Sequence, residues 1–429
     1  MKIYNNPDKS LWAGILKRPA IDTTTLFGTV GEILKNVKQN GDAAVREYVS
    51  KFDKSDTPDF LVTEKEFQDA DNQLDTSLKN AILMAKANIE RFHNTQKSAV
   101  EMVETMTGID CWRKSVGIER VGLYIPGGTA PLLSTVLMLG VPAQIAGCHE
   151  VVLCTPSQRN APIHPAILFA AKAVGIAKVF KIGGVQAIGA MAYGTETVPQ
   201  VWKIFGPGNQ YVTAAKQLIN TEGVAIDMPA GPSEVMVIAD NTARPNFVAA
   251  DLLAQAEHGV DSQVVLVAFD DTMVRNILQE IDNQLVNLPR AEFAKAALDN
   301  SVAVIVNNDT QAMAVANFYA AEHLIISTSN ADVLAEQVVN AGSVFIGHFS
   351  PESVGDYASG TNHVLPTNGY ARAYSGVSVD SFVKKITFQR LNTEGVKNIG
   401  HSVIEMAEAE QLRGHAHAVQ VRLDEIEGL

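Results

Sequence analysis

The stretch DLLAQAEHG, which begins at Asp251, holds residue types that bind metals at the spacing of a helix. Asn246 can cap a helix here, and Gly259 can end it. On such a helix Asp251, Gln255 and His258 fall at i, i+4 and i+7 and share one face. A carboxylate, an amide oxygen and an imidazole placed one turn apart can bind one divalent metal ion. The alternative is an ordinary surface helix with a polar flank.

Further candidates for chemistry follow in the second half of the chain. Glu322 and His323 are adjacent, and such a pair can divide acid–base work, one activating water and the other moving a substrate proton. The alternative is a helix C-terminus where a histidine interacts favourably with the helix dipole. The irregular stretch SPESVGDYASGTNHVLPT contains Asp356 and His363, and a loop of this length inside a compact domain is usually functional. Both are candidate metal or substrate contacts.

Two series of strands and helices must position these residues. From residue 121 short apolar strands alternate with helices, as in VGLYIP followed by a helix over Leu133–Ala146, which predicts βαβ units and a parallel sheet. A second series of the same kind begins at Val235. The crevice between the two α/β units is the default ligand site.

Glycine-rich turns fall at the predicted carboxyl ends of strands in the first series, where parallel sheets bind ligands. They are Pro126–Gly127–Gly128, Gly183–Gly184 and Gly206–Pro207–Gly208–Asn209. Backbone without side chains lets a pyrophosphate approach, and the following helix N-terminus favours its charge. None of the turns is a G-x-G-x-x-G, however, and glycine often serves backbone geometry alone. The turns by themselves therefore leave nucleotide binding open.

The C-terminal part of the chain has the pattern of amphipathic helices. Ser402 and Glu405 match a capping box, and the helix that they open is expected to end at Gly414. His415 then lies on the apolar face of the next helix, and Glu410 precedes the break. The alternatives to functional roles are a satisfied core histidine and a solvated surface carboxylate.

Length and composition bound the class of protein. A chain of 429 residues predicts two large domains with smaller attachments, and residues 1–20 have the weak periodicity of an arm. A net charge of −13 argues against nucleic acid and anionic membranes as partners, because both require a basic patch. No apolar run reaches the about 18 residues of a membrane span, and the first residues lack the apolar core of a signal peptide. Three cysteines fit reduced thiols, so we expect a cytoplasmic protein.

Long stretches of the sequence resemble the histidinol dehydrogenase family. They are VGLYIPGGTAPLLSTVLMLGVPAQIAG, GGVQAI, FGPGN, DMPAGPSE, DLLAQAEHG, AEHL and SPESVGDYASGTNHVLPT. The resemblance implies an α/β fold with two Rossmann-like α/β domains (incomplete Rossmann folds), a small N-terminal arm and a C-terminal helical tail, in an intertwined homodimer. The expected boundaries are 1–20 for the arm, 21–118 with 234–378 for the domain with the metal and catalytic residues, 119–233 for the NAD-side domain, and 379–429 for the tail.

The resemblance also implies the contacts of the site. The zinc ligands would be Gln255, His258, Asp356 and His415, a set that replaces the helix face with Asp251. Substrate contacts would be these four ligands together with Ser233, His323, His363 and Glu410. NAD contacts would be Tyr124, Gln186 and Asn209. One zinc ion per subunit is implied, and the active site would be shared between two subunits.

The implied reaction is the oxidation of L-histidinol to L-histidine through histidinal with two NAD, the last two steps of histidine biosynthesis. Glu322 and His323 would be the catalytic residues of this NAD-dependent alcohol and aldehyde oxidoreductase. His323 would take the alcohol proton, and Glu322 would activate the water that adds to the aldehyde. Neither nucleic acid nor a membrane is an implied partner.

Other interpretations of the same residues are available. A related dehydrogenase could act on another small polar alcohol, and a zinc hydrolase could use two histidines, one carboxylate and a glutamate. Cys148 or Cys154 could form a thiohemiacetal, but no base lies near either in sequence, and buried thiols are the alternative. The chain departs from the family pattern at Trp202, where an acidic residue is usual. His417 offers a second imidazole two residues beyond His415.

Overall fold

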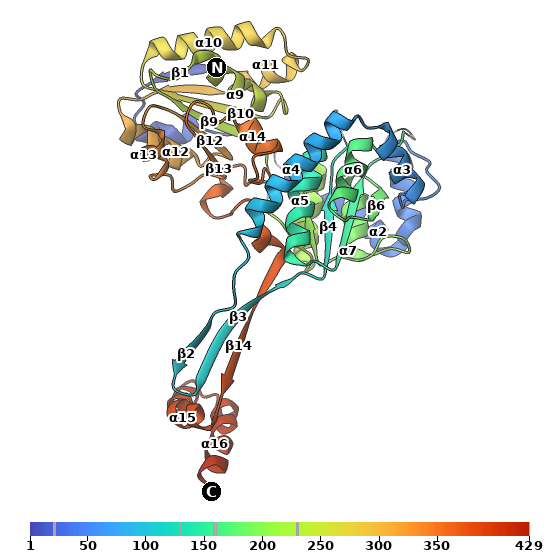
Figure 1. Cartoon of the computed structure of the whole chain (residues 1–429), viewed down its shortest axis with the longest axis vertical. Helices are drawn as coiled ribbons and strands as arrows, with labels where there is room; N and C mark the ends of the chain where they lie inside the picture. Colours follow the sequence, from blue (N-terminus) through green and yellow to red (C-terminus); the bar gives the residue numbers. More distant parts are fainter. Residues whose placement is uncertain (20–22, 128–130, 158, 160, 229–230, 429) are drawn as a thin grey trace. The chain divides into compact units, whose positions relative to one another are not determined.

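The computed structural model describes residues 1–428 except 20–22, 128–130, 158, 160 and 229–230. The chain divides into two compact units, which are drawn in Figure 1. Unit 1 comprises Met1–Gln96 and Ile118–Phe382, and unit 2 comprises Lys97–Gly117 and Val383–Leu429. Unit 1 contains two parallel sheets with helices around them, so the predicted α/β class is confirmed.

The first sheet of unit 1 has five parallel strands in the order β6-β5-β4-β7-β8. The strands are β4 (Arg120–Tyr124), β5 (Glu150–Thr155), β6 (Lys178–Lys181), β7 (Lys203–Phe205) and β8 (Ala225–Ile226). The helices between them are α5 (Leu133–Ala146), α6 (Pro165–Ala173), α7 (Gly184–Tyr193) and α8 (Gln210–Thr221). Because β4 lies between β5 and β7, the strand order reverses there, and the turns after β4 and β7 meet at the place where such sheets bind ligands.

Three helices from the start of the chain pack around this sheet. They are α2 (Phe27–Tyr48), α3 (Glu64–Gln73) and α4 (Thr76–Asn94), and they contact α7, α6 and α5 respectively. Leu34 of α2 belongs to one apolar cluster with Ile188 of α7, and Ile89 of α4 belongs to another with Leu137 of α5. The expected boundaries place residues 21–118 with the other α/β domain; the apolar faces of these helices are instead buried on the five-stranded sheet.

The second sheet of unit 1 has six parallel strands in the order β1-β11-β10-β9-β12-β13. The strands are β1 (Lys2–Asn5), β9 (Glu234–Ala239), β10 (Gln263–Ala268), β11 (Val302–Ile305), β12 (His323–Ser327) and β13 (Ser343–Ile346). The helices are α1 (Trp12–Ile15), α9 (Pro245–Ala256), α10 (Asp271–Leu285), α11 (Ala291–Asp299), α12 (Asp309–Tyr319), α13 (Ala331–Ala335) and α14 (Glu352–Tyr357). Val237 packs with residues of α9 and α10, and Met236 packs with residues of α12, so successive residues of β9 fill two apolar cores.

The first residues of the chain are part of this second sheet, and they do not form the expected arm. Strand β1 pairs in parallel with β11, and Trp12 and Leu16 are buried in the adjoining core. Arg18 is anchored beyond them by two hydrogen bonds to the buried carboxylate of Glu234. The segment is short and its strand lies at a sheet edge, which is why its periodicity is too weak to read from sequence.

Unit 2 contains an antiparallel sheet in the order β14-β3-β2. Its strands are β2 (Met102–Met106), β3 (Ile109–Gly117) and β14 (Val383–Leu391). The expected boundaries gave residues 97–117 no strand and made residues 379–429 a helical tail. Instead Val383–Leu391 of the tail form β14, which pairs with β3 along its whole length. The two strands are distant in sequence, so no local pattern indicates the pairing. The pairing supplies backbone hydrogen bonds that neither segment could form alone.

Two helices follow the sheet of unit 2, and their boundaries differ from the expected ones. Helix α15 (Thr393–Ala409) begins after Asn392, whose side chain accepts a hydrogen bond from the Gly395 N–H at 2.9 Å. Ser402 therefore lies inside the helix and does not cap it. Helix α16 (Arg413–Glu427) already contains Gly414, so the break between the helices precedes this glycine.

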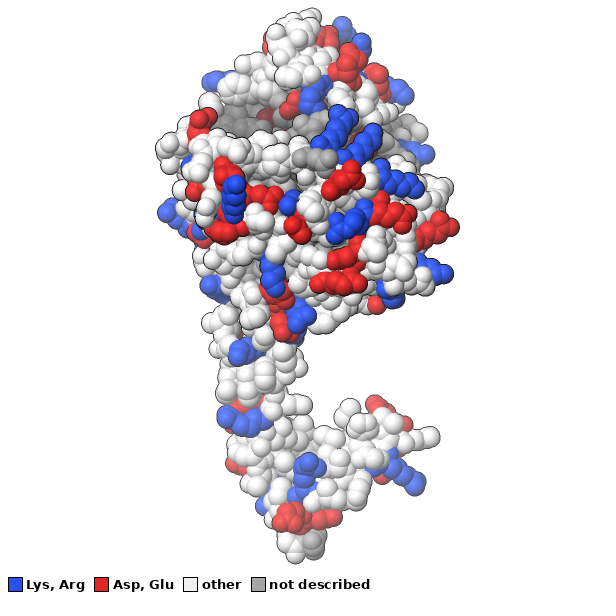
Figure 2. Space-filling view, turned by 90° about the vertical axis from the view of Figure 1, so that its right-hand side faces the viewer, with Lys and Arg blue, Asp and Glu red and all other residues white. Residues whose placement is uncertain are grey.

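The distribution of surface charge and the composition of the helices are relevant to nucleic acids and membranes as possible partners. Acidic and basic side chains are interspersed on the face of unit 1 seen in Figure 2. Among the described residues, no helix combines the length and the apolar composition needed to cross a bilayer.

The turn after β7 is held by a buried ion pair. The Gly206 N–H donates to Asp227 Oδ2 at 2.8 Å, and Lys216 Nζ donates to the Gly206 carbonyl at 2.9 Å. Lys216 and Asp227 also pair with each other, and both side chains are buried. Gly206 has a φ of 124°, and a Cβ on it would lie 2.0 Å from the carbonyl oxygen of Tyr124. No side chain fits at this position.

We therefore expect Gly206→Ala to lower the free energy of unfolding more than Gly147→Ala does. Gly147 also has a positive φ, of 76°, but a Cβ added to it would have no other atom within 4 Å. The control thus measures the backbone penalty alone, about 1–2 kcal/mol. Gly206→Ala should cost at least about 2 kcal/mol more, because the clash with backbone cannot relax. Equal denaturant midpoints for the two variants would show that this turn is not tightly constrained.

Candidate active site

A pocket of about 180 Å³ in unit 1 brings together most of the predicted site residues. It is lined by Ser233, Gln255, His258, Glu322, His323, Asp356 and His363, together with Leu132, Thr135, Pro207 and Asp227 among others. The five-stranded sheet contributes turns at the carboxyl ends of its strands, as expected. The six-stranded sheet contributes the amino ends of β9 and β12 and the end of α9, which the general rule for parallel sheets does not predict.

His323 is at the centre of a buried hydrogen-bonding and ionic network. Its Nδ1 lies 3.2 Å from the Glu234 carbonyl oxygen, and its Nε2 lies 3.3 Å from Asp356 Oδ1. Within the described chain, neither Nε2 nor that carboxylate oxygen has a hydrogen-bond partner. Burial favours the neutral ring, but the carboxylates of Glu322 and Asp356 outweigh it and raise the pKa of His323 to about 10. The ring is therefore held in place on one side and has a free nitrogen on the other.

Glu322 is buried beside His323, with its Oε2 3.7 Å from the His323 Nδ1. The same oxygen accepts a hydrogen bond from the Glu234 N–H at 2.9 Å. Burial raises the pKa of Glu322 to about 7, although the neighbouring imidazole opposes this shift. A carboxyl group with such a pKa can exchange a proton near neutral pH, as a general base requires.

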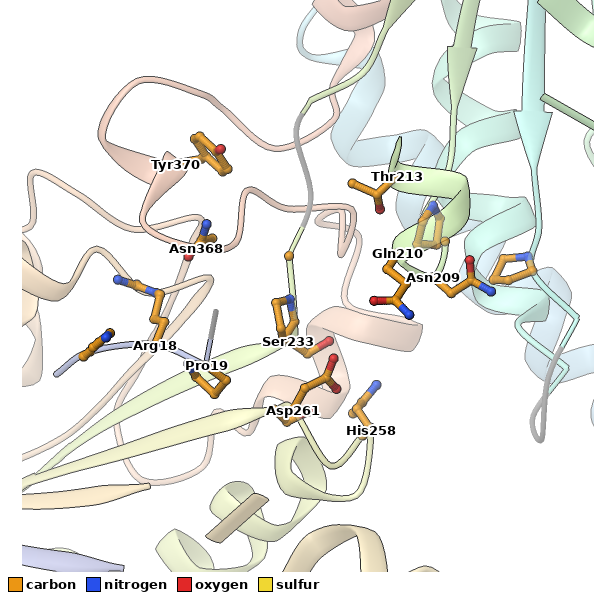
Figure 3. Close-up of a pocket in the computed structure, with 18 of the residues that line it drawn as sticks. Arg18, Pro19, Asn209, Gln210, Thr213, Ser233, His258, Asp261, Asn368 and Tyr370 are labelled. Carbon is orange, nitrogen blue, oxygen red and sulfur yellow. The ribbon is translucent and has the colours of Figure 1, made fainter. Parts of the chain in front are cut away.

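Helix α9 presents Gln255 and His258 differently from the predicted helix face. The helix begins at Pro245 and ends at Ala256, so Asn246 is not its cap and His258 lies beyond its last turn. Figure 3 shows the His258 side chain directed into a pocket; the surrounding protein lowers the pKa of His258, although the residue remains exposed to solvent. Asp251 lines neither pocket described for unit 1; burial raises its pKa to about 7.

The amide of Gln255 meets donors and acceptors that fix its orientation. With the nitrogen toward Glu352, it donates to Glu352 Oε1 at 3.0 Å, and the amide oxygen accepts from the Glu234 N–H at 2.8 Å. In the opposite orientation the amide nitrogen would face the Glu234 N–H and would have only Glu322 Oε2, at 3.4 Å, as an acceptor. Gln255 is 1% exposed, so water cannot satisfy these groups instead.

Asp356 and His363 come from the stretch predicted to be irregular. Residues 352–357 form helix α14, which holds Asp356, and His363 follows in the loop. His363 Nδ1 lies 2.7 Å from the Asp356 carbonyl oxygen, and its Nε2 lies 3.1 Å from Thr135 Oγ1. Burial opposes ionisation of Asp356, but the His323 imidazole 3.3 Å away prevails and lowers the pKa of Asp356. Burial lowers the pKa of His363, so its imidazole is neutral.

A second pocket, of about 890 Å³, adjoins the first and shares Leu132, Pro207, Ser233 and His258 with it. Figure 3 shows its two walls. Asn209, Gln210 and Thr213 extend from α8 and the preceding turn, and face the side formed by residues that include Ser233, Asp261 and Asn368. A space of this size next to the small pocket can hold an elongated ligand that reaches His323 with one end.

Comparison with known proteins places this geometry in a family. A sequence model described as Histidinol dehydrogenase matches residues 16–423. The chain belongs to the histidinol dehydrogenase family. A histidinol dehydrogenase of Bacteroides thetaiotaomicron is 58% identical over 424 residues, covering 99% of each chain. A chloroplastic histidinol dehydrogenase of Oryza sativa is 53% identical, covering 96% of this chain and 88% of that protein.

A solved structure agrees with this assignment. The crystal structure of histidinol dehydrogenase from Elizabethkingia anophelis superposes with a TM-score of 0.96 at 51% identity, covering 100% of this chain and 99% of that one. The family predicted from the sequence motifs is therefore confirmed, and membership of the histidinol dehydrogenase family makes this chain an oxidoreductase.

Of the three residues that the family resemblance assigns to NAD, only Asn209 lines one of the two pockets. Asn209 lines the larger pocket, where its side chain also caps α8 by accepting from the Val212 N–H at 3.1 Å. Tyr124 is buried, and its hydroxyl accepts from the Gly184 N–H at 3.0 Å. Gln186 is fully buried beside Asp53. Tyr124 and Gln186 thus brace the Gly183–Gly184 turn, while Gly128 of the first predicted turn lies outside the described residues.

Glu410 and His415, which the family resemblance assigns to the substrate and to zinc, belong to unit 2. Glu410 is the C-terminal cap residue of α15, His415 lies in the first turn of α16, and both side chains are exposed. Among the described residues, no group of three or more His, Cys, Asp or Glu side chains is placed to hold a metal. His258 and Asp356 are the two predicted ligands of these types in unit 1, and Gln255 adds an amide.

The cysteines do not support covalent chemistry. Cys154 is fully buried in the core, and burial raises the pKa of its thiol. Burial likewise raises the pKa of Cys148 to about 11, and its thiol contacts the Phe382 carbonyl. Neither residue lines the two pockets, so the thiohemiacetal alternative has no site here.

Sequence reasoning missed three residues that shape the site. Glu352 contacts Gln255, Thr135 contacts His363, and the backbone of Glu234 contacts both Glu322 and His323. Glu352 could have been found, since it precedes Asp356 by four residues and would share its helix face. Thr135 and Glu234 carried no signal, because their roles depend on contacts between distant segments.

Proposed function

We propose that this chain oxidises L-histidinol to L-histidine, with histidinal as the intermediate and two NAD as the hydride acceptors. The observation that carries the proposal is the convergence of Gln255, His258, Glu322, His323 and Asp356 on one pocket. Two histidines, two acidic groups and an amide supply the acid–base and ligand chemistry that both oxidations require. Family membership and the names of the relatives support the same substrate.

We propose zinc as the metal of this site, held by Gln255, His258, Asp356 and His415. The donor set fits a borderline-soft cation, because His258 is a neutral imidazole and Asp356 is ionised. The unpaired, buried Asp356 Oδ1 provides further support, because a buried carboxylate oxygen usually has a partner. When bound, zinc would hold the imidazole and amino groups of the substrate and neutralise part of the local negative charge.

His323 is proposed as the base for both oxidations, in the state in which a metal ion on Asp356 offsets the carboxylate charge that otherwise raises the pKa of His323 and keeps the ring protonated. Its Nδ1 is directed at the Glu234 carbonyl, so a neutral ring would carry its proton on Nδ1 and leave Nε2 as the acceptor. In the first oxidation Nε2 takes the hydroxyl proton of L-histidinol while a hydride leaves the same carbon for NAD. In the second, it takes a hydroxyl proton of the histidinal hydrate while a second hydride leaves, which gives the carboxylic acid.

Glu322 is proposed to form that hydrate. Its carboxylate takes a proton from water as the water oxygen adds to the aldehyde carbon of histidinal. The carbonyl oxygen takes back the proton that His323 accepted in the first oxidation, which completes the hydrate and returns His323 to its neutral form. A pKa near 7 suits this role, because the group is partly ionised at neutral pH and can also release the proton again. The pocket of about 180 Å³ leaves little room for bulk water, which would keep histidinal at the site between the two steps.

NAD is proposed to occupy the larger pocket, with its nicotinamide near the residues that both pockets share. The volume of about 890 Å³ and the shared lining residues Ser233, His258 and Pro207 support this placement. Asn209 would contact the cofactor directly. Tyr124 and Gln186, which are buried, would contribute by holding the Gly183–Gly184 turn unless the cofactor displaces them.

A homodimer with a shared active site is proposed, because unit 2 exposes more apolar surface than an isolated unit of its size would. Its large exposed apolar side chains are Val100, Met102, Val103, Met106, Ile386, Phe388, Leu391, Met406, Leu412 and Val421. Its buried residues are few and mostly small, such as Ala407 and Ala416. A second copy of the chain would cover this surface and would bring His415 and Glu410 to the pocket of its neighbour.

The direct test is NADH formation from L-histidinol by zinc-loaded and chelator-treated protein. We expect two NADH for each L-histidine formed, because four electrons leave the substrate as two hydrides. The chelated protein should be inactive and should recover when zinc is added. Absence of NADH formation from L-histidinol by the zinc-loaded protein would refute the proposed reaction.

Glu322→Gln should impair the second oxidation more than the first, since the first requires no activated water. With supplied histidinal, the variant should form L-histidine about 10²–10⁴-fold more slowly than the unmodified chain. The conversion of L-histidinol to histidinal, followed in a single turnover, should change much less. Glu336→Gln, which removes an exposed carboxylate outside both pockets, is the matched control. Oxidation of histidinal at the unmodified rate would remove Glu322 from this role.

Mixing inactive variants tests the shared site. A heterodimer of His415→Ala and Gln255→Ala chains should have one site with all four ligands and a second site that lacks two. Activity should therefore return to about half of the original value per heterodimer. A mixture of Gln255→Ala and His258→Ala chains is the control, since both ligands come from the same unit and every site stays defective. If the first mixture forms heterodimers and stays inactive, each chain builds its own site.

A further inference from the structure

Glu352 is a buried carboxyl group for which the proposed mechanism has no role. It is the first residue of α14, and its side chain is 1% exposed. Its Oε2 has no hydrogen-bond partner in the described part of the chain. Burial among other carboxylates raises the pKa of Glu352 well above its ordinary value, so the group is a neutral carboxylic acid whose lost hydration is still not fully compensated. Such a group is retained in a folded protein when it serves another purpose.

The contact that Glu352 does make is with Gln255. Glu352 Oε1 accepts a hydrogen bond from the amide nitrogen of Gln255 at 3.0 Å. On its other side, the Gln255 amide oxygen accepts from the Glu234 N–H at 2.8 Å. The carboxyl oxygen of Glu352 and the backbone donor of Glu234 thus favour this orientation, against Glu322 Oε2, which lies 3.4 Å from the oxygen end of the amide.

The orientation matters because the two ends of an amide differ in chemistry although they are nearly equal in shape. The oxygen carries two lone pairs and can bind a cation, whereas the nitrogen carries two hydrogens and cannot. One lone pair of the Gln255 oxygen remains after the hydrogen bond from Glu234. A carboxyl oxygen that accepts from the amide nitrogen also polarises the amide, which increases the negative charge on the amide oxygen.

Helix α14 connects this contact to a second proposed ligand. Glu352 and Asp356 are four residues apart in the helix, so their side chains lie on the same face. Asp356 would bind the metal itself, while Glu352 would act on the metal only through Gln255. A single short helix would therefore place one ligand and orient another.

We propose that Glu352 is a positioning residue that holds the amide oxygen of Gln255 toward the metal and thereby sets the affinity of the site for zinc. The inference rests on the proposed zinc site. Residues that orient metal ligands typically change metal affinity by about 10–100-fold when they are removed.

The test measures the zinc dissociation constant of the full-length protein by competition with a chromogenic chelator. Glu352→Leu keeps the volume but removes the acceptor, and it should weaken zinc binding by about 10–100-fold. Glu352→Gln keeps an oxygen at the same place and should stay within about threefold of the original affinity, since its amide can still accept from Gln255. Glu336→Leu, on the surface, is the control for the substitution itself.

A double-mutant cycle separates action through Gln255 from a general effect of Glu352. On a Gln255→Ala background, Glu352→Leu should cause no further loss of zinc affinity, because there is no amide to orient. The thermal midpoint of the metal-free protein is the second readout. Glu352→Leu should not lower it, since the change removes a buried carboxyl group with an unpaired oxygen; a purely structural residue would lower it.

The outcomes separate this inference from the zinc proposal. If the unmodified protein binds no zinc, the zinc site itself is refuted and this inference with it. If that protein binds zinc and Glu352→Leu binds it equally well, only the role of Glu352 is refuted. Should Glu352→Leu not fold, Glu352→Asp replaces it, because the shorter side chain withdraws the acceptor. Equal zinc affinity of the Asp and Gln variants would then overturn the inference.

Discussion

The site depends on the burial of one imidazole among carboxylates. His323 is held at Nδ1 by a backbone carbonyl and faces Asp356 with Nε2, while Glu322 lies beside it. In a buried position these charges interact strongly, which is why the pKa of His323 rises and that of Asp356 falls. Removing any one of them would leave its neighbours buried and unpaired. The surrounding fold must therefore place all of them together.

The two sheets of unit 1 place the residues of the site together, and they do so with opposite ends of their strands. The six-stranded sheet supplies the amino ends of β9 and β12, so Glu234 and His323 are adjacent on neighbouring strands. The five-stranded sheet supplies the turns after its carboxyl ends, and Gly206 is clamped there by Lys216 and Asp227. The rigid turns form one wall of both pockets, and the acidic network forms the other side of the small one.

Sequence patterns predicted elements whose stability comes from neighbouring residues, and they missed elements that depend on pairing with distant segments. The helix over Leu133–Ala146 has the predicted ends, because its apolar run and flanking turns are contiguous. Strands β1 and β14 were missed, since their stability comes from pairing with distant segments. In the site, motif resemblance identified Glu322, His323 and Asp356, whereas Glu352 and Thr135 became apparent only from their contacts. At Ser402 the sequence pattern predicted a helix start that does not exist. The capping pattern lies inside α15, which begins after Asn392.

The central claim is that the pocket around His323 is a zinc-centred active site completed by a second copy of the chain. Anomalous diffraction at the zinc absorption edge, from crystals of the zinc-loaded protein, tests this claim most directly. The account predicts one zinc per chain, bound by Gln255, His258 and Asp356 of one chain and by His415 of the other. Zinc bound away from these side chains, or a site whose four ligands all come from one chain, would contradict it.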